Sequence, residues 1–272
     1  ARVNNIGTLM WSMIDWHNDH LTLRFAKSKK DQLGDRCHTI RLFANPWNYQ
    51  MCGVTALAIR LTEKGIRKKH NRVFACDAAS KYANDLRKYL KDHERSFMES
   101  ALLGTHSVRK GAANHATGQG MIADVLMATL LRGNWNIGNT LPRYFRIHEG
   151  SDAVVGRMLA GLNARDTTFA ALPPHFTCWN DELQGILDLQ YPSSTNPIHG
   201  KRLLTRMLLA SLVYHREEIK NDLRVAAPDH PLFRTAVFTM PNEQYQRVKA
   251  CLYTSAQGNT MPILIGERPI GQ

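Results

Sequence analysis

The segment 20–28, HLTLRFAKS, most constrains how this chain can fold. Its large apolar residues alternate with polar ones, and a period of two places them on one face of a β-strand. Extended segments are also expected at 7–16 and 36–44, and the charged, Gly-containing stretch 29–35 is typical of a turn. Three neighbouring strands predict a small antiparallel sheet at the N-terminal end.

Helical periodicity dominates the rest of the chain. Apolar residues recur at helical spacing in the stretches 52–65, 76–94 and 201–223. The stretch 120–133 is apolar enough to be a buried helix, and short helices are expected over 138–147 and 151–162, the second with Ser and Asp as caps. A further helix is expected to open at Ser107. The sequence therefore predicts an α+β fold that is mostly α-helical.

A change of composition divides the chain in two. The stretch 169–177 contains Pro173 and Pro174, which break a helix and indicate a new segment. We expect one domain over residues 1–165 and a C-terminal extension of uncertain fold over residues 166–272.

The charge of the chain points to an anionic partner. It has 35 Lys and Arg against 23 Asp and Glu, a net charge of +12. Such a surplus favours nucleic acid first and an acidic membrane surface second. A basic protein without such a partner is the alternative.

The cysteines and the apolar runs of the sequence indicate which kinds of site and compartment are expected. None of the five cysteines belongs to a Cys-x-x-Cys pair: Cys37, Cys52, Cys76, Cys178 and Cys251. A zinc site or disulfide framework is not expected, and a reducing, intracellular compartment fits. No apolar run approaches the ~20 residues that span a bilayer, so no membrane-spanning segment is expected, and a membrane is not among the expected partners.

The stretch 102–117, LLGTHSVRKGAANHAT, carries a candidate anion site. His106 and Arg109 are three residues apart, so on a helix they share one face. The start of a helix also carries partial positive charge, which favours phosphate. Taken alone, the spacing equally fits a capping histidine beside a solvated arginine.

Four further residues complete an ordered pattern with this pair. Arg2 and Lys29 precede it, Lys29 in the turn between the second and third strands, and Trp135 precedes Tyr144 by nine residues. This order over residues 2–176 resembles the tyrosine recombinases, the phage-integrase and Cre-like enzymes, and most of all the Crypton-type recombinases of eukaryotic mobile elements. The resemblance implies that 1–165 is a recombinase catalytic domain.

The cationic residues suit a phosphodiester under attack, because negative charge builds on its non-bridging oxygens. Arg2 and Arg109 would clamp these oxygens in fork geometry. His106 would donate a hydrogen bond or move a proton, and the Trp135 indole would add an N–H donor that never titrates.

The covalent step falls to Tyr144, whose hydroxyl would form a phosphotyrosyl ester and preserve the bond energy for rejoining. Lys29 is the expected general acid for the departing 5′ oxygen. This chemistry requires neither a metal nor another cofactor. Four basic residues near the site are expected to contact DNA phosphates: Lys27, Lys30, Lys110 and Arg132.

The resemblance further implies double-stranded DNA as the partner, several protomers assembled on it, and nuclear work. Three other interpretations stay open. The chain could be a catalytically silent DNA-binding module, an enzyme that relaxes DNA like a type IB topoisomerase, or a basic structural protein in which the spacing is coincidental.

Overall fold

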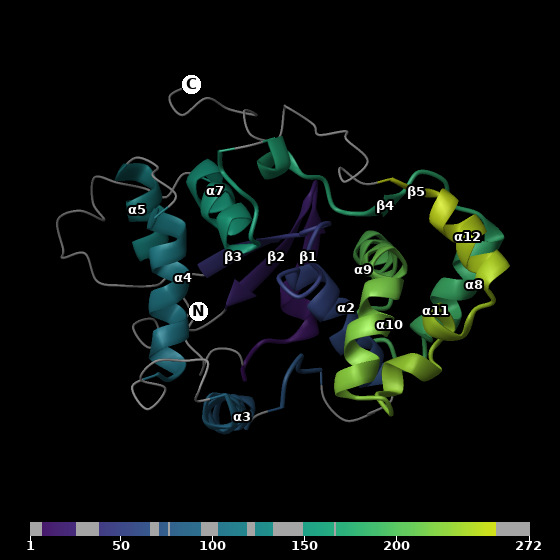
Figure 1. The fold of residues 1–272 in the computed structure, drawn as a ribbon. Helices are drawn as coiled ribbons and strands as arrows, with labels where there is room; N and C mark the ends of the chain where they lie inside the picture. Colours follow the sequence, from purple (N-terminus) through teal and green to yellow (C-terminus); the bar gives the residue numbers. More distant parts are fainter. Residues whose placement is uncertain are drawn as a thin grey trace.

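The computed structural model of the chain describes residues 7–25, 38–65, 71–75, 77–93, 103–118, 123–132, 149–165 and 167–253. Within these ranges the fold is a mostly helical α+β arrangement (Figure 1). No described helix is long and apolar enough to cross a membrane.

The predicted three-stranded antiparallel sheet is confirmed. Its strands β1 (Ile14–His17), β2 (His20–Phe25) and β3 (His38–Phe43) lie in the order β1-β2-β3. The tight turn between β1 and β2 places Asn18 at a φ of 49°, a left-handed conformation that Asn tolerates better than most residues. The first strand is shorter than expected, because the segment Trp11–Met13 forms a 3-10 turn.

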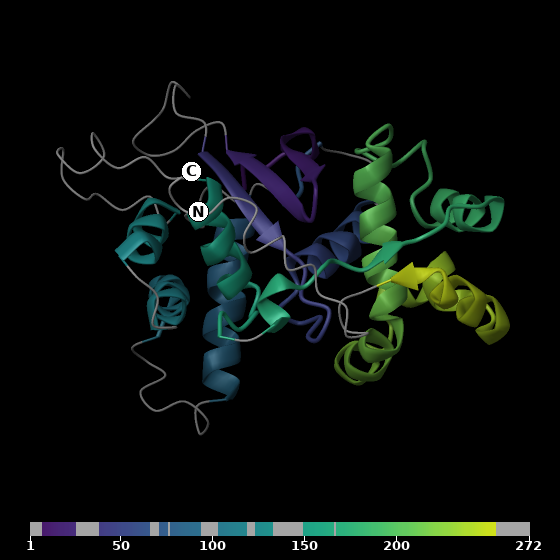
Figure 2. The same ribbon diagram turned by 90° about the horizontal axis from the view of Figure 1, so that it is seen from above.

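The helices surround this sheet on two sides. In chain order they are α2 (Gly53–Gly65), α3 (Ala78–Asp92), α4 (Thr105–Gly118), α5 (Ala123–Arg132), α7 (Glu149–Leu159), α8 (Asp181–Gln190), α9 (Arg202–Tyr214), α10 (Arg216–Ala226), α11 (Ala236–Thr239) and α12 (Asn242–Ala250). Figures 1 and 2 show α4, α5 and α7 on one side of the sheet and α8 to α12 on the other. Two short strands, β4 (His175–Phe176) and β5 (Leu252–Tyr253), form a separate antiparallel pair.

The helix predicted over 201–223 is two helices in the structure. α9 ends at Tyr214 and α10 begins at Arg216, with His215 between them. The His215 side chain is completely buried, and its Nδ1 lies 2.8 Å from Oε2 of Glu218. Neither Gly nor Pro marks this break, so periodicity alone could not locate it.

The main hydrophobic core joins early and late parts of the chain. α9 is buried along most of its length and packs on α2, where Leu57 and Ala58 face a core that also holds Leu208 and Leu212. A buried hydrogen bond of 2.8 Å between the Thr55 and Ser211 hydroxyls crosses the same contact. Residues on both sides of the expected boundary at 165 thus share one core.

A smaller core lies between β3 and the helices α4, α5 and α7. Phe43 of β3 meets Val155 and Met158 of α7 there, and Ala116 of α4 and Ala128 of α5 are buried in the same core. This core fixes the position of α4 relative to the sheet.

Candidate active site

The first turns of α4 carry the His-x-x-Arg pair. The helix begins at Thr105, two residues earlier than expected, and the Gly104 N–H donates to Oγ of Ser107 at 3.1 Å. His106 is exposed and Arg109 is half-buried. No acidic residue lies in this first turn, so nothing within it offsets the positive end of the helix dipole.

Contacts with α7 hold the far end of α4. Nε2 of His115 lies 3.1 Å from the carbonyl oxygen of Met158, near the end of α7. Ala116 is fully buried at the same contact. The orientation of α4, and with it the direction in which His106 and Arg109 are presented, therefore depends on α7.

A buried ion pair joins α5 to α7. Nη1 of Arg132, in the last turn of α5, lies 2.5 Å from Oδ1 of Asp152, in the first turns of α7. Nη2 of Arg132 donates to the carbonyl oxygen of Arg41 in β3, also at 2.5 Å. Asp152 further accepts a hydrogen bond of 3.2 Å from the Arg41 N–H.

This geometry corrects the expectation for Arg132. Arg132 is only 6% exposed, and its guanidinium is hydrogen-bonded to the Asp152 carboxylate and to a backbone carbonyl of β3. A group held in this way cannot also serve as an open phosphate contact. Lys110 on α4 is exposed, and its contact with a DNA phosphate stays a prediction.

The same ion pair has a consequence for the segment 133–148. Because Arg132 and Asp152 are in contact, the end of α5 and the start of α7 are neighbours. The connection between them carries Trp135 and Tyr144, which lie outside the described residues.

The strand pairing supports part of the expectation for the basic turn. Phe25 at the end of β2 pairs with His38 at the start of β3, so the intervening residues connect two adjacent antiparallel strands. The predicted residues of this connection, Lys27, Lys29 and Lys30, lie outside the described residues, as does Arg2. Of the six proposed catalytic residues, the structure therefore places His106 and Arg109.

A second buried ion pair fixes α7 to the sheet. The Arg157 guanidinium contacts the Asp19 carboxylate in the turn between β1 and β2, and it also donates to the Phe169 carbonyl oxygen at 2.8 Å. The guanidinium carbon of Arg157, Cζ, lies 4.4 Å from the centroid of the Phe43 ring. Burial lowers the pKa of Arg157, and the charge of Asp19 opposes that shift. α7 is thus anchored at both ends, and α4 and α5 are positioned through it.

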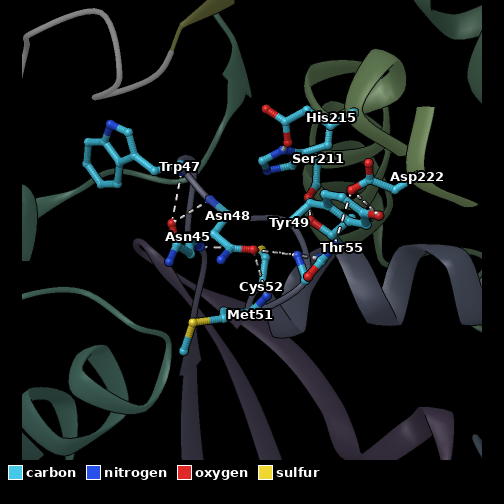
Figure 3. Close-up of polar contacts among 12 residues, drawn as sticks. Asn45, Trp47, Asn48, Tyr49, Met51, Cys52, Thr55, Ser211, His215 and Asp222 are labelled. Atoms are coloured by element: carbon cyan, nitrogen blue, oxygen red, sulfur yellow. Dashed lines mark hydrogen bonds and ion pairs between the residues drawn. The ribbon is translucent and has the colours of Figure 1, made fainter. Parts of the chain in front are cut away.

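The loop between β3 and α2 forms a polar network that the sequence analysis missed (Figure 3). Oδ1 of Asn45 accepts hydrogen bonds from the N–H groups of Trp47 and Asn48, at 2.9 and 3.0 Å. Its Nδ2 donates to the Ala160 carbonyl oxygen at 2.8 Å. The signal was the Asn-Pro pair at 45–46, because Asn side chains commonly bond to the backbone of the turn that follows.

This loop also contacts the α9–α10 junction. The Tyr49 hydroxyl donates to Oδ2 of Asp222 at 3.1 Å, and the Tyr49 ring lies beside that of His215 (Figure 3). Burial lowers the pKa of His215, and the hydrogen bond with Glu218 opposes the shift. The other ring nitrogen, Nε2, is buried and makes no hydrogen bond to any described residue, although the Asn45 carbonyl is near enough to affect the pKa. The network therefore links the end of β3 to the end of α7 and to α10, and we interpret its role as structural.

Within the described ranges, no three His, Cys, Asp or Glu side chains gather as potential metal ligands. Comparison with protein-family models, curated proteins and solved structures gave no match to this chain. What the geometry offers is a histidine and an arginine at a helix start, on a helix that packs against α5 and α7.

Proposed function

We propose that this chain cleaves and rejoins DNA strands through a 3′-phosphotyrosyl intermediate, with Tyr144 as the nucleophile. The observation that carries the proposal concerns α4. Its first turns present His106 and Arg109, and it packs on α5 and α7, the two helices joined by the segment that carries Trp135 and Tyr144. The donors and the nucleophile are thus attached to one packed unit.

The sheet supports the role proposed for Lys29. The pairing of β2 with β3 makes residues 26–37 the link between two adjacent strands. A lysine in such a link can reach out from the sheet toward a bound phosphate. The Arg157–Asp19 ion pair joins α7 to the other end of the same strand β2, so the sheet and the helix that supports α4 belong to one packed unit.

In the proposed mechanism Arg109 and Arg2 hold the non-bridging oxygens of the scissile phosphate. His106 and the Trp135 indole donate further hydrogen bonds as negative charge grows on these oxygens. The Tyr144 oxygen attacks phosphorus, the bond to the 5′ oxygen breaks, and Lys29 protonates the departing oxygen. A 5′ hydroxyl of a second strand then reverses these steps and frees Tyr144.

The net charge of +12 supports double-stranded DNA as the partner. Exchange of strands between two duplexes requires several protomers on DNA, and we propose such an assembly and nuclear action for this chain. Lys110, exposed beside the pair on α4, contributes a phosphate contact.

A nicked suicide duplex tests the proposal, because cleavage then releases a short strand and traps the covalent ester. The full chain should form an adduct that Tyr144→Phe loses while DNA affinity changes little. Tyr82→Phe, on the exposed surface of α3, is the matched control and should keep the adduct.

Three results distinguish the competing functions. Binding without an adduct in the unaltered chain indicates a silent DNA-binding module. An adduct accompanied by plasmid relaxation, but no exchange between duplexes, indicates a topoisomerase. Loss of binding in Tyr144→Phe would give Tyr144 a structural role and refute the proposal.

A further inference from the structure

The small sheet formed by β4 and β5 brings together two cysteines from distant parts of the chain. His175 pairs with Tyr253 and Phe176 pairs with Leu252. Beyond these pairs, the Thr177 N–H donates to the Cys251 carbonyl oxygen at 2.9 Å. The next residue is Cys178. Continuation of the ladder thus sets Cys251 opposite the residue that immediately precedes Cys178.

The side chain of Thr177 reinforces this contact. Its hydroxyl donates to the same Cys251 carbonyl oxygen at 3.0 Å. The chain bends at Thr177, directly after β4 ends at Phe176, and Cys251 caps the end of α12. The two backbones are therefore held together at the point where each changes direction.

Both thiols can meet a dissolved reagent. Cys178 is exposed and Cys251 is half-buried, and both are free thiols. The hydrogen bond with the Cys178 thiol raises the pKa of Cys251, and burial and the nearby Glu182 raise it further.

We propose that Cys178 and Cys251 form a reversible disulfide when the protein meets a small-molecule disulfide such as oxidised glutathione. This inference is independent of the DNA chemistry proposed above. The backbone contact favours it, because a disulfide requires Cα atoms only about 4.4–6.8 Å apart, and Cys178 directly follows Thr177, whose backbone is hydrogen-bonded to Cys251.

The reaction proceeds by two exchanges. The thiolate of Cys178, the more exposed sulfur, attacks one sulfur of oxidised glutathione, forms a mixed disulfide and releases one glutathione thiolate. The Cys251 thiolate then attacks the Cys178 sulfur, closes the protein disulfide and releases the second glutathione. The two protons lost by the protein thiols go to the released glutathiones, so two protein thiols are oxidised as one disulfide is reduced.

The disulfide would close a long loop that contains α8 to α12. Cross-links across long loops restrict the unfolded chain most. α9 within this loop supplies much of the main core. Oxidation should therefore raise the thermal midpoint of the whole chain, by about 5 °C or more.

The test uses the full chain with Cys37→Ser and Cys76→Ser, which removes the two cysteines outside the described residues. After incubation with oxidised glutathione, mass spectrometry should find a peptide that links residues 178 and 251, with a loss of about 2 Da for the two hydrogens. The thermal midpoint should rise and should return when dithiothreitol is added. Cys52, which is buried, should keep its thiol and serves as an internal control.

Single variants separate the two steps. Cys251→Ser should stop at a stable glutathione adduct on residue 178, with no rise of the thermal midpoint. Cys178→Ser should give no intramolecular link. If the parent chain itself accumulates the adduct on Cys178, or if both thiols stay reduced, the proposed disulfide is wrong.

Discussion

Gly156 of α7 lies so close to Arg41 of β3 that a Cβ atom on it would stand 2.9 Å from the Arg41 carbonyl oxygen. The same atom would come within 3.0 Å of two carbons of the Phe43 ring. α7 therefore lies on β3 with no room for even a methyl group. This close approach is part of the support on which α4 presents His106 and Arg109.

Gly156→Ala should consequently destabilise the protein. The added methyl group forces α7 from β3, and overpacking of this kind costs about 1–3 kcal/mol, partly offset by the better helix propensity of Ala. Urea denaturation followed by circular dichroism measures the free energy of unfolding. The matched control is Gly185→Ala in α8, where no atom lies within 4 Å of the new Cβ; it should gain up to about 1 kcal/mol. Equal effects of the two substitutions would contradict the close packing of α7.

Asp152→Asn should be more damaging, because it leaves the buried guanidinium of Arg132 without a counter-charge. Breaking a buried ion pair by removing one partner costs about 3–5 kcal/mol. The exposed pair of Glu182 and Arg247, 2.9 Å apart, provides the comparison, and Glu182→Gln should cost less than about 1 kcal/mol. Denaturant titration of both variants checks this, and a small loss in Asp152→Asn would show that the Arg132 pair is not essential to the fold.

Arg109→Ala should slow DNA cleavage far more than it weakens DNA binding. Removal of one donor aimed at the transition-state oxyanion typically costs a factor of about 10²–10³ in rate. Single-turnover adduct formation at saturating suicide substrate gives the rate, and a filter-binding titration gives the affinity. Lys110→Ala, one residue further along α4, should do the reverse, with weaker binding at an unchanged rate. If Arg109→Ala lowered the rate and the affinity by the same factor, Arg109 would be a contact with the DNA backbone and not a catalytic residue.

The buried His215 should make stability fall in mild acid. Its pKa is lowered by burial, although Glu218 opposes this shift and Tyr49 and Asp222 lie nearby. As the pH falls below the ordinary histidine value of 6.5, the unfolded chain binds a proton that the folded chain does not. The free energy of unfolding then decreases by up to about 1.4 kcal/mol per pH unit, until the folded-state pKa is reached.

His215→Asn checks this dependence, since Asn keeps a polar group near Glu218 but does not titrate. Urea denaturation at several pH values between about 5 and 7.5 should show a flatter slope below pH 6.5 in this variant than in the parent chain. His93→Asn, at an exposed site, should leave the slope unchanged. If the free energy of unfolding of the parent chain changed with pH as little as that of His215→Asn, His215 would not be the cause of the acid sensitivity.

Local patterns in the sequence predicted much of the first half of the fold. The alternation in 20–28 correctly predicted β2, and the apolar stripe in 52–65 matched α2 within one residue. Both elements bury one regular face against a core, which is what such periodicities report. The Gly-Thr break before His106 likewise placed the start of α4 within two residues.

Long-range contacts explain what the sequence did not reveal. Nothing near Arg132 indicates that Asp152 will neutralise it, because the partner lies on another helix. The break at His215 depends on burial among side chains of the Asn45 loop and α10. Charge counting cannot distinguish a buried cation such as Arg132 from an exposed one such as Lys110.

The contact between α2 and α9 has a consequence for any attempt to shorten this protein. A fragment that stops near residue 165 would expose to water the side of α2 that holds Leu57 and Ala58, since α9 covers it in the intact chain. Such a fragment would carry an exposed apolar surface that is prone to self-association. A shortened descendant of this sequence would have to replace that surface with polar side chains or find another protein to cover it.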